Sequence, residues 1–413
     1  MRSSPTPALA WFLMLGVAVV GSNSLALSPI LGDVANDLQA TPVAVARANA
    51  AYGGATAVSA LALGRYVDRI GAERALALGL LVLAAAMVGS AAATHWIWLA
   101  LSQGLAGAAG GIVLPASYAL ATAIAPPGRG AETLGRVLTG WSLSLVAGVP
   151  LSAAIASALS WRASYLVLAV LLVLAAIPLA RIASGRKSDA STGSLSDALR
   201  RPGVVPLLAV CLLFMTAFYG VYAYIGDHAR RLLGLSATEA GFIVLAYGAG
   251  FGFATFGDRF VDRFGAARLF PLVLTIVAAT YVALIPGVAD FRSVMVLAAL
   301  WGFANHFGLN ILVLQLSRSA PDARVAVLAL NSAISYAGAL VGAALFGLFY
   351  DRYGFSMVTG AAALCSGAAA LIALMHALRS GAMGRISVAA GTELKGAGGK
   401  DTCSPAERSL RTP

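Results

Sequence analysis

Long uncharged apolar runs recur from one end of the chain to the other, separated by short polar gaps. Each run is close to the roughly 20 residues that an α-helix needs to cross about 30 Å of hydrocarbon. Interpreted as membrane spans, the runs fall into two sets of six. The first set is 8–30, 44–64, 75–94, 96–123, 133–159 and 163–181, and the second is 204–225, 238–257, 269–287, 292–316, 325–349 and 354–378.

Helices are the expected spanning element, because a helix satisfies its backbone hydrogen bonds within itself. A membrane barrel would instead show alternating strands of about ten residues. The pattern therefore predicts an all-α membrane protein with twelve transmembrane helices in two six-helix halves. The predicted divisions are an N-terminal half at 1–181, a cytoplasmic linker at 182–203, a C-terminal half at 204–378 and a disordered cytoplasmic tail at 379–413.

Composition supports a lipid environment. Hydrophobic residues make up 59% of the 413 residues and charged residues only 11%, whereas soluble domains carry about 25% charged residues. The net charge of +11 does not indicate a nucleic-acid partner, because the basic residues lie in the short gaps and do not gather on one arm. Three widely separated cysteines predict neither a disulfide framework nor a metal site, and no cofactor is expected.

The distribution of basic residues predicts orientation. Of the 28 Lys and Arg residues, 22 fall at the termini, in the linker and in the alternate gaps on the same side, which is typical of cytoplasmic loops. The stretch 8–30 is longer than a typical signal-peptide core, so it is expected to stay as the first span. The chain is predicted to cross a bacterial inner membrane with both termini cytoplasmic. The residues expected on the other side are Arg47, Arg162, Arg230, Arg231, Arg292 and Arg352.

An internal repeat relates the two halves. Residues 64–74 align without gaps on 258–268, with seven identities in eleven positions. Each copy joins the second and third spans of its half. Parallel repeats of this kind build transporters whose substrate site lies near the bilayer midplane, between the repeats.

The repeated loop resembles the G-x-x-x-D-R-x-G loop of the major facilitator superfamily. The residues that carry the resemblance are Gly64, Asp68, Arg69, Gly71 and Arg74 in the first copy, and Asp262, Arg263 and Gly265 in the second. The resemblance implies a gating loop between inward-open and outward-open states. Ala72-Glu73 departs from the family, which usually has basic residues there, so a weaker electrostatic lock is expected.

Span 5 resembles the twelve-helix drug and metabolite efflux branch of that superfamily. Gly148 and Pro150 belong to a Gly-Val-Pro-Leu motif, and Trp161-Arg162 follows it. This resemblance implies export of a small molecule in exchange for protons, by alternating access. Ala100 stands before Gln103-Gly104, where the family often has an arginine linked to proton coupling. That part of the coupling apparatus is missing.

His306 is the main candidate for proton coupling, because it is the only ionisable residue near the middle of a predicted span and histidine titrates near neutral pH. The alternative is a neutral histidine that bonds neighbouring helices. Asp33 and Asp227 close the first helices of the two halves and are further candidates, although helix-end carboxylates are commonly just solvated. No acidic residue falls at a predicted midplane, which favours a neutral or anionic substrate.

Substrate-binding candidates are polar or aromatic residues within the spans. Tyr219 and Tyr222 share one helix face, and the resemblance places helices 1, 4, 7 and 10 around a central cavity. The further candidates are Asn23, Gln103, Asn305 and Asn310. Hydrogen bonds between helices are an alternative role for the amides, and an aromatic belt is an alternative for the tyrosines.

These observations predict a monomeric secondary transporter whose partners are a small-molecule substrate, protons and the lipid bilayer. An enzyme is not expected, because no nucleophile, metal cluster or acid-base pair lies within the spans. A facilitator or importer of a small metabolite is the alternative within transport. A sensor that transports nothing would leave the repeated loops unexplained.

Overall fold

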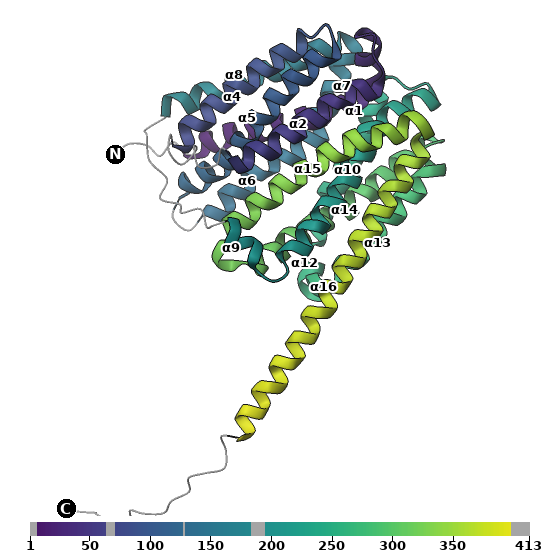
Figure 1. Ribbon diagram of the computed structural model, residues 1–413. Coiled ribbons are helices and arrows are strands. Elements are labelled where there is room, and N and C mark those ends of the chain that lie inside the picture. The colour runs from purple at the N-terminus through teal and green to yellow at the C-terminus, as the bar shows by residue number, and fades with distance from the viewer. Residues whose placement is uncertain (1–5, 63–70, 127–128, 183–194, 398–413) are drawn as a thin grey trace, which may run out of the picture.

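The computed structural model describes residues 6–62, 71–126, 129–182 and 195–397, and these residues form a helical bundle (Figure 1). The first half contains α1 (Thr6–Asp37), α2 (Pro42–Ala62), α4 (Ala72–Ala91), α5 (Trp96–Ala123), α6 (Gly130–Leu143), α7 (Val149–Ala158) and α8 (Trp161–Ile182). The second half contains α10 (Val204–Leu233), α11 (Ala237–Phe253), α13 (Ala266–Gly287), α14 (Phe291–Ser319), α15 (Arg324–Tyr353) and α16 (Phe355–Ala397). Two short helices, α9 (Leu195–Arg200) and α12 (Asp258–Phe264), lie between longer ones.

The predicted all-α membrane fold is confirmed. Each of the twelve predicted spans corresponds to a helix, or in span 5 to α6 and α7 joined by a π-helical turn. Within the described ranges, eleven helical segments are long and apolar enough to cross a membrane, and α2 is the remaining helix of the twelve.

The two halves repeat the same packing. In the first half α4 packs on α5 and α8, and in the second half α13 packs on α14 and α16. The pairs α2 with α5 and α1 with α6 have their counterparts in α11 with α14 and α10 with α15. Gly71 and Gly265 precede α4 and α13 with the same φ of +88°, a backbone conformation that favours glycine. The chain therefore enters α4 and α13 through the same glycine conformation.

The halves meet along three main helix pairs, α1 with α10, α2 with α15 and α7 with α11. A Cβ added at Gly53 in α2 would lie 2.9 Å from the backbone oxygen of Tyr336 in α15. Glycine at this position therefore permits the close approach of backbones that is common between membrane helices.

We call the end of the bundle that holds α9 and the start of α1 the near end, and the end that holds the connections 38–41 and 234–236 the far end. At the far end α1 and α10 run to Asp37 and Leu233, about two turns beyond the predicted limits of 30 and 225. The charged residues that ended those predicted spans lie within the helices. Several of them pair with one another, as described below.

Parts of the predicted linker and tail are helical in the described residues. In the linker, α9 is helical, and Arg201 next to it forms an ion pair of 3.2 Å with Asp322. The last helix, α16, continues past 379 to Ala397 and projects from the bundle (Figure 1). Extending an existing helix requires no new nucleation. The remaining parts of these predictions, 183–194 and 398–413, lie outside the described residues.

Candidate functional site

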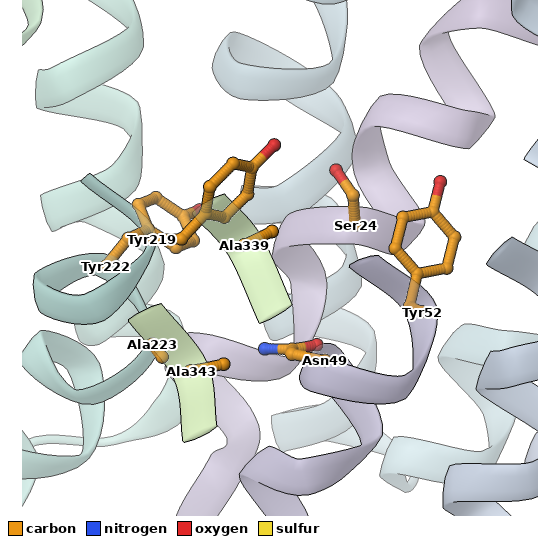
Figure 2. Close-up of a pocket in the computed structure, with 8 residues that line it drawn as sticks. All are labelled: Ser24, Asn49, Tyr52, Tyr219, Tyr222, Ala223, Ala339 and Ala343. Atoms are coloured by element: carbon orange, nitrogen blue, oxygen red, sulfur yellow. The ribbon is translucent and has the colours of Figure 1, made fainter. Parts of the chain in front are cut away.

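A small cavity lies between the two halves (Figure 2). Its lining comes from α1 and α2 in the first half and from α10 and α15 in the second. The lining residues are Ser24, Asn49, Tyr52, Tyr219, Tyr222, Ala223, Ala339 and Ala343. The free space has room for about one water molecule. The cavity is thus almost closed in this conformation.

Buried hydroxyl groups around this cavity lack hydrogen-bond partners. Within the described part of the chain, the Tyr52 and Tyr222 hydroxyls have none, although the two residues are only 2% and 3% exposed. The Tyr336 hydroxyl is also unpartnered, and its ring meets the Tyr52 ring edge-on with centroids 6.1 Å apart. Buried polar groups are nearly always paired, so these hydroxyls are the unusual feature of the site.

The polar groups lie on two sides of the cavity. Figure 2 shows the hydroxyls of Ser24, Tyr52 and Tyr219 directed to the same side, while the amide of Asn49 lies on the other. Ala339, on α15, lies between Tyr219 and Ser24 in this view. The site therefore offers hydroxyl groups at one level and an amide at another.

The structure brings the predicted residues Tyr219 and Tyr222 to this cavity. Two other predicted residues, Asn23 and Gln103, bond each other through both amide atoms at 3.0 and 3.2 Å. Gln103 also donates to Ser90 at 3.0 Å. This buried network joins α1, α4 and α5, and neither amide is among the lining residues.

Asn305 lies in an aromatic cluster inside the second half. Its amide nitrogen donates to the Tyr247 hydroxyl at 3.0 Å. The Tyr247 ring packs against Trp301 and Tyr222, with centroid distances of 4.9 and 6.4 Å. One side of this cluster thus borders the central cavity through Tyr222, while Asn305 itself does not line the cavity.

His306 has a carboxylate partner that the sequence did not reveal. Its Nε2 lies 2.9 Å from Oδ1 of Asp258, the first residue of α12, and Asn310 donates to the same oxygen at 2.8 Å. The histidine side chain is 11% exposed, and its Nδ1 is buried without a partner among the described residues. A histidine and a carboxylate in contact form a group that can hold or release a proton.

The other acidic candidates take part in contacts at the far end. Asp33 in α1 receives two hydrogen bonds from Arg230 in α10, of 2.7 and 2.8 Å. Asp227 is 2% exposed, accepts a hydrogen bond of 2.7 Å from Tyr350 and pairs with Arg231 at 3.1 Å. Both carboxylates are thus engaged in ion pairs, and their role in proton coupling stays a prediction.

The predicted gating loop is described only in part. Gly64, Asp68 and Arg69 lie outside the described residues. Arg74 and Arg263 are exposed, and Asp262 belongs to α12. The gating role of this loop stays a prediction.

The span 5 motif coincides with an irregular turn. Ser144–Gly148 is π-helical, with the Val149 N–H bonded to the Ser144 carbonyl, and Pro150 follows directly. Proline has no N–H to donate, and π-helical turns are one way for a helix to adjust. A Cβ at Gly148 would lie only 1.8 Å from the Ser22 hydroxyl of α1. Glycine is thus required for this contact.

Several residues of the site were not predicted from the sequence, among them Asn49, Tyr52, Tyr336 and Asp258. Asn49 and Tyr52 are a polar and an aromatic residue inside an apolar span, a signal that applies equally to residues that only join helices. Asp258 is the first residue of α12, and it contacts His306 of α14 only because the fold brings these two helices together. The sequence separation of the two residues does not indicate this contact. Among the described residues, no group of three or more His, Cys, Asp or Glu side chains is arranged to hold a metal ion.

Comparison with known proteins agrees with this architecture. The family model described as Major Facilitator Superfamily matches residues 13–316 and 227–391. The chain belongs to the major facilitator superfamily, and it is accordingly a multi-pass membrane transporter and not an enzyme. It is 26% identical over 359 residues to "Uncharacterized MFS-type transporter YwfA" of Bacillus subtilis (strain 168), covering 85% of this chain and 87% of that protein.

Proposed function

We propose that the chain is a proton-coupled secondary transporter that exports a small neutral or anionic organic molecule by alternating access. The observation that carries the proposal is the central cavity, whose lining comes from both halves and includes buried hydroxyls without partners. A site built from two repeats can open to one side or the other when the halves tilt about it.

Contacts between the halves at the far end support a conformation that is closed there. Arg230 of the second half bonds Asp33 of the first, and the Ser28 hydroxyl donates to the backbone oxygen of Tyr222. Opening of the far end would have to break both contacts. Alternation then consists of exchanging these contacts for others at the near end.

His306 and Asp258 support proton coupling. The pair joins α14 to α12 on the near side of the aromatic cluster that borders the cavity. Gain or loss of a proton changes the charge of the pair, and hence the strength of its hydrogen bond. The conformational preference of the second half would follow the protonation state.

Export, and not uptake, is supported by the likeness of Gly148 and Pro150 in span 5 to the efflux branch. The excess of Lys and Arg at the near end supports a bacterial inner-membrane location with both termini in the cytoplasm. We further propose that the protein acts as a monomer, because the cavity is formed within one chain.

A second candidate is a facilitator or importer of a small metabolite. Ala100 favours it, because the arginine that the resemblance associates with proton coupling is missing there. The two candidates differ in their response to a proton gradient. A facilitator equilibrates its substrate whether or not a gradient is present.

The test is flux in proteoliposomes with an imposed pH gradient. Substrates would first be found by counterflow with labelled neutral and anionic compounds. If the protein exchanges protons for substrate, protons that flow out of the liposomes should drive accumulation of the substrate inside them. Dissipating the pH gradient should stop this accumulation. Equilibration that does not respond to the gradient would favour the facilitator, and no flux of any compound would contradict both candidates.

A further inference from the structure

We propose that the central cavity binds small, uncharged, planar aromatic molecules that carry hydrogen-bond acceptors. The inference rests on the proposed function in one respect: it takes this cavity as the substrate site. It goes further by naming the chemistry of the ligand. Three properties of the lining carry it, namely unpartnered donors, aromatic walls and the absence of charge among the eight lining residues.

The unpartnered hydroxyls favour a ligand that carries hydrogen-bond acceptors. Tyr52 and Tyr222 belong to opposite halves, and each hydroxyl is buried with no partner among the described residues. A phenolic O–H is a donor at neutral pH, and leaving it buried and unbonded is unfavourable. A ligand with a carbonyl oxygen or ring nitrogen at two edges would bond both hydroxyls and so connect the halves.

The walls favour a flat ring. Tyr219 and Tyr222 lie one turn apart on α10, and Phe218 packs on both rings with centroid distances of 4.9 and 5.4 Å. Ala339 and Ala343, one turn apart on α15, add only methyl groups. Aromatic rings attract one another in offset and edge-to-face arrangements. A planar ring also requires less separation of the halves than a saturated ring with the same number of atoms.

The ligand is expected to be uncharged. The lining consists of Ser, Asn, Tyr and Ala side chains. Asp33 pairs with Arg230, and Asp258 contacts His306, so none of these side chains is among the lining residues or free to balance a ligand charge. Burying an ion without an opposite charge is strongly unfavourable. The Asn49 amide, by contrast, offers both a donor and an acceptor to a neutral polar group.

Matched sets of three compounds test the inference. Each set holds a neutral aromatic amide, the corresponding carboxylate and the amide with a saturated ring. Benzamide, benzoate and cyclohexanecarboxamide form one set, and 4-hydroxybenzamide, 4-hydroxybenzoate and 4-hydroxycyclohexanecarboxamide form another. Binding to the purified full-length protein is measured by ligand-dependent thermal stabilisation. The inference predicts that the aromatic amides bind about tenfold more tightly than their partners. It is overturned if the carboxylates or the saturated amides bind equally well, or if no aromatic amide binds.

Two substitutions locate the binding. Tyr222→Phe and Tyr52→Phe each remove one unpartnered hydroxyl and keep the ring, and each should weaken binding about five- to tenfold. Without ligand, Tyr222→Phe should be as stable as the parent protein or more so, because the Tyr222 hydroxyl has no hydrogen-bond partner among the described residues. Tyr165→Phe is the control, since Tyr165 is buried in α8 and does not line the cavity. Unchanged affinity in both cavity variants would overturn the assignment.

The failure of this inference can be told apart from failure of the proposed function. Binding in detergent requires neither flux nor a proton gradient. If the aromatic amides bind but no compound is transported, the transport proposal fails and the ligand chemistry stands. If carboxylates or saturated compounds are transported and the aromatic amides do not bind, transport stands and the ligand chemistry is wrong.

Discussion

Asp33 and Arg230 join the first helices of the two halves at the far end, with both carboxylate oxygens of Asp33 bonded to the guanidinium group of Arg230. Arg230 also donates to the backbone oxygen of Pro29 at 3.1 Å. An arginine that engages a carboxylate through two nitrogens holds it in a defined geometry. The contact lies between bodies that must separate if the far end opens.

Arg230→Ala should therefore increase opening of the far end. The measurement is the rate at which a water-soluble maleimide, added at the far side, labels a single cysteine at Ser24 in the cavity. We expect a several-fold faster rate in the variant. Arg162→Ala is the matched control, because Arg162 also pairs at the far end but with Asp37 of its own half. Equal rates in the two variants would show that the Asp33 contact does not restrain opening.

We expect the pH dependence of transport to require the contact between His306 and Asp258. His306→Gln and Asp258→Asn each keep a polar side chain and remove the titrating pair. Because both variants lose the contact between a histidine and a carboxylate, the initial rate of transport should lose its dependence on pH in both. Asn310→Ala removes a neighbouring bond to Asp258 without removing a titratable group. A parent-like profile in His306→Gln would exclude this residue from coupling.

Substitution of Gly148 by a larger residue is expected to disturb the contact between α1 and span 5 sterically. Gly148→Ala places a methyl group against the Ser22 hydroxyl and should lower the free energy of unfolding by about 1–3 kcal/mol. Adding Ser22→Gly should restore part of the loss, because it removes the opposing side chain. Gly135→Ala in α6 is the control, since no atom lies within 4 Å of its added Cβ. It should be neutral or stabilise the helix by roughly 0.5–1 kcal/mol. Thermal denaturation of the purified variants distinguishes these outcomes.

Substitution of Gln103 is expected to change the stability of the protein and not its choice of substrate. Gln103→Met leaves the amide of Asn23 buried without its partner, which should cost about 1–3 kcal/mol of stability. The affinity of the cavity for its ligands should stay unchanged, since Gln103 does not line the cavity. Ligand titrations at a temperature where the variant is folded provide the check. A selective loss of one ligand class would show that Gln103 contacts substrate.

The sequence predicted the helices well, because lipid imposes a strong and simple constraint on span length. The main errors occurred where charges lie inside a helix. Asp33 and Arg230 are 197 residues apart in sequence, so their pairing could not be seen in either segment alone.

The candidate site was predictable only in part. Tyr219 and Tyr222 could be predicted because both lie on one face of a helix. Tyr52 and Asn49 belong to the other half, and their position opposite α10 depends on how the halves dock. Asn23 was predicted as a binding residue because it is a polar residue within a span. Its hydrogen bond with Gln103 depends on how α1 packs against α5, which the sequence does not show.

Access to the cavity from both sides of the membrane tests the central claim most directly. In a background with Cys211→Ala, Cys365→Ala and Cys403→Ala, a single cysteine at Asn49 would be labelled in vesicles of each orientation, with and without a proton gradient. The account predicts that the cysteine reacts from both sides. It also predicts that cross-linking cysteines placed at Asp33 and Arg230 abolishes labelling from the far side only. Labelling from a single side under every condition would contradict alternating access.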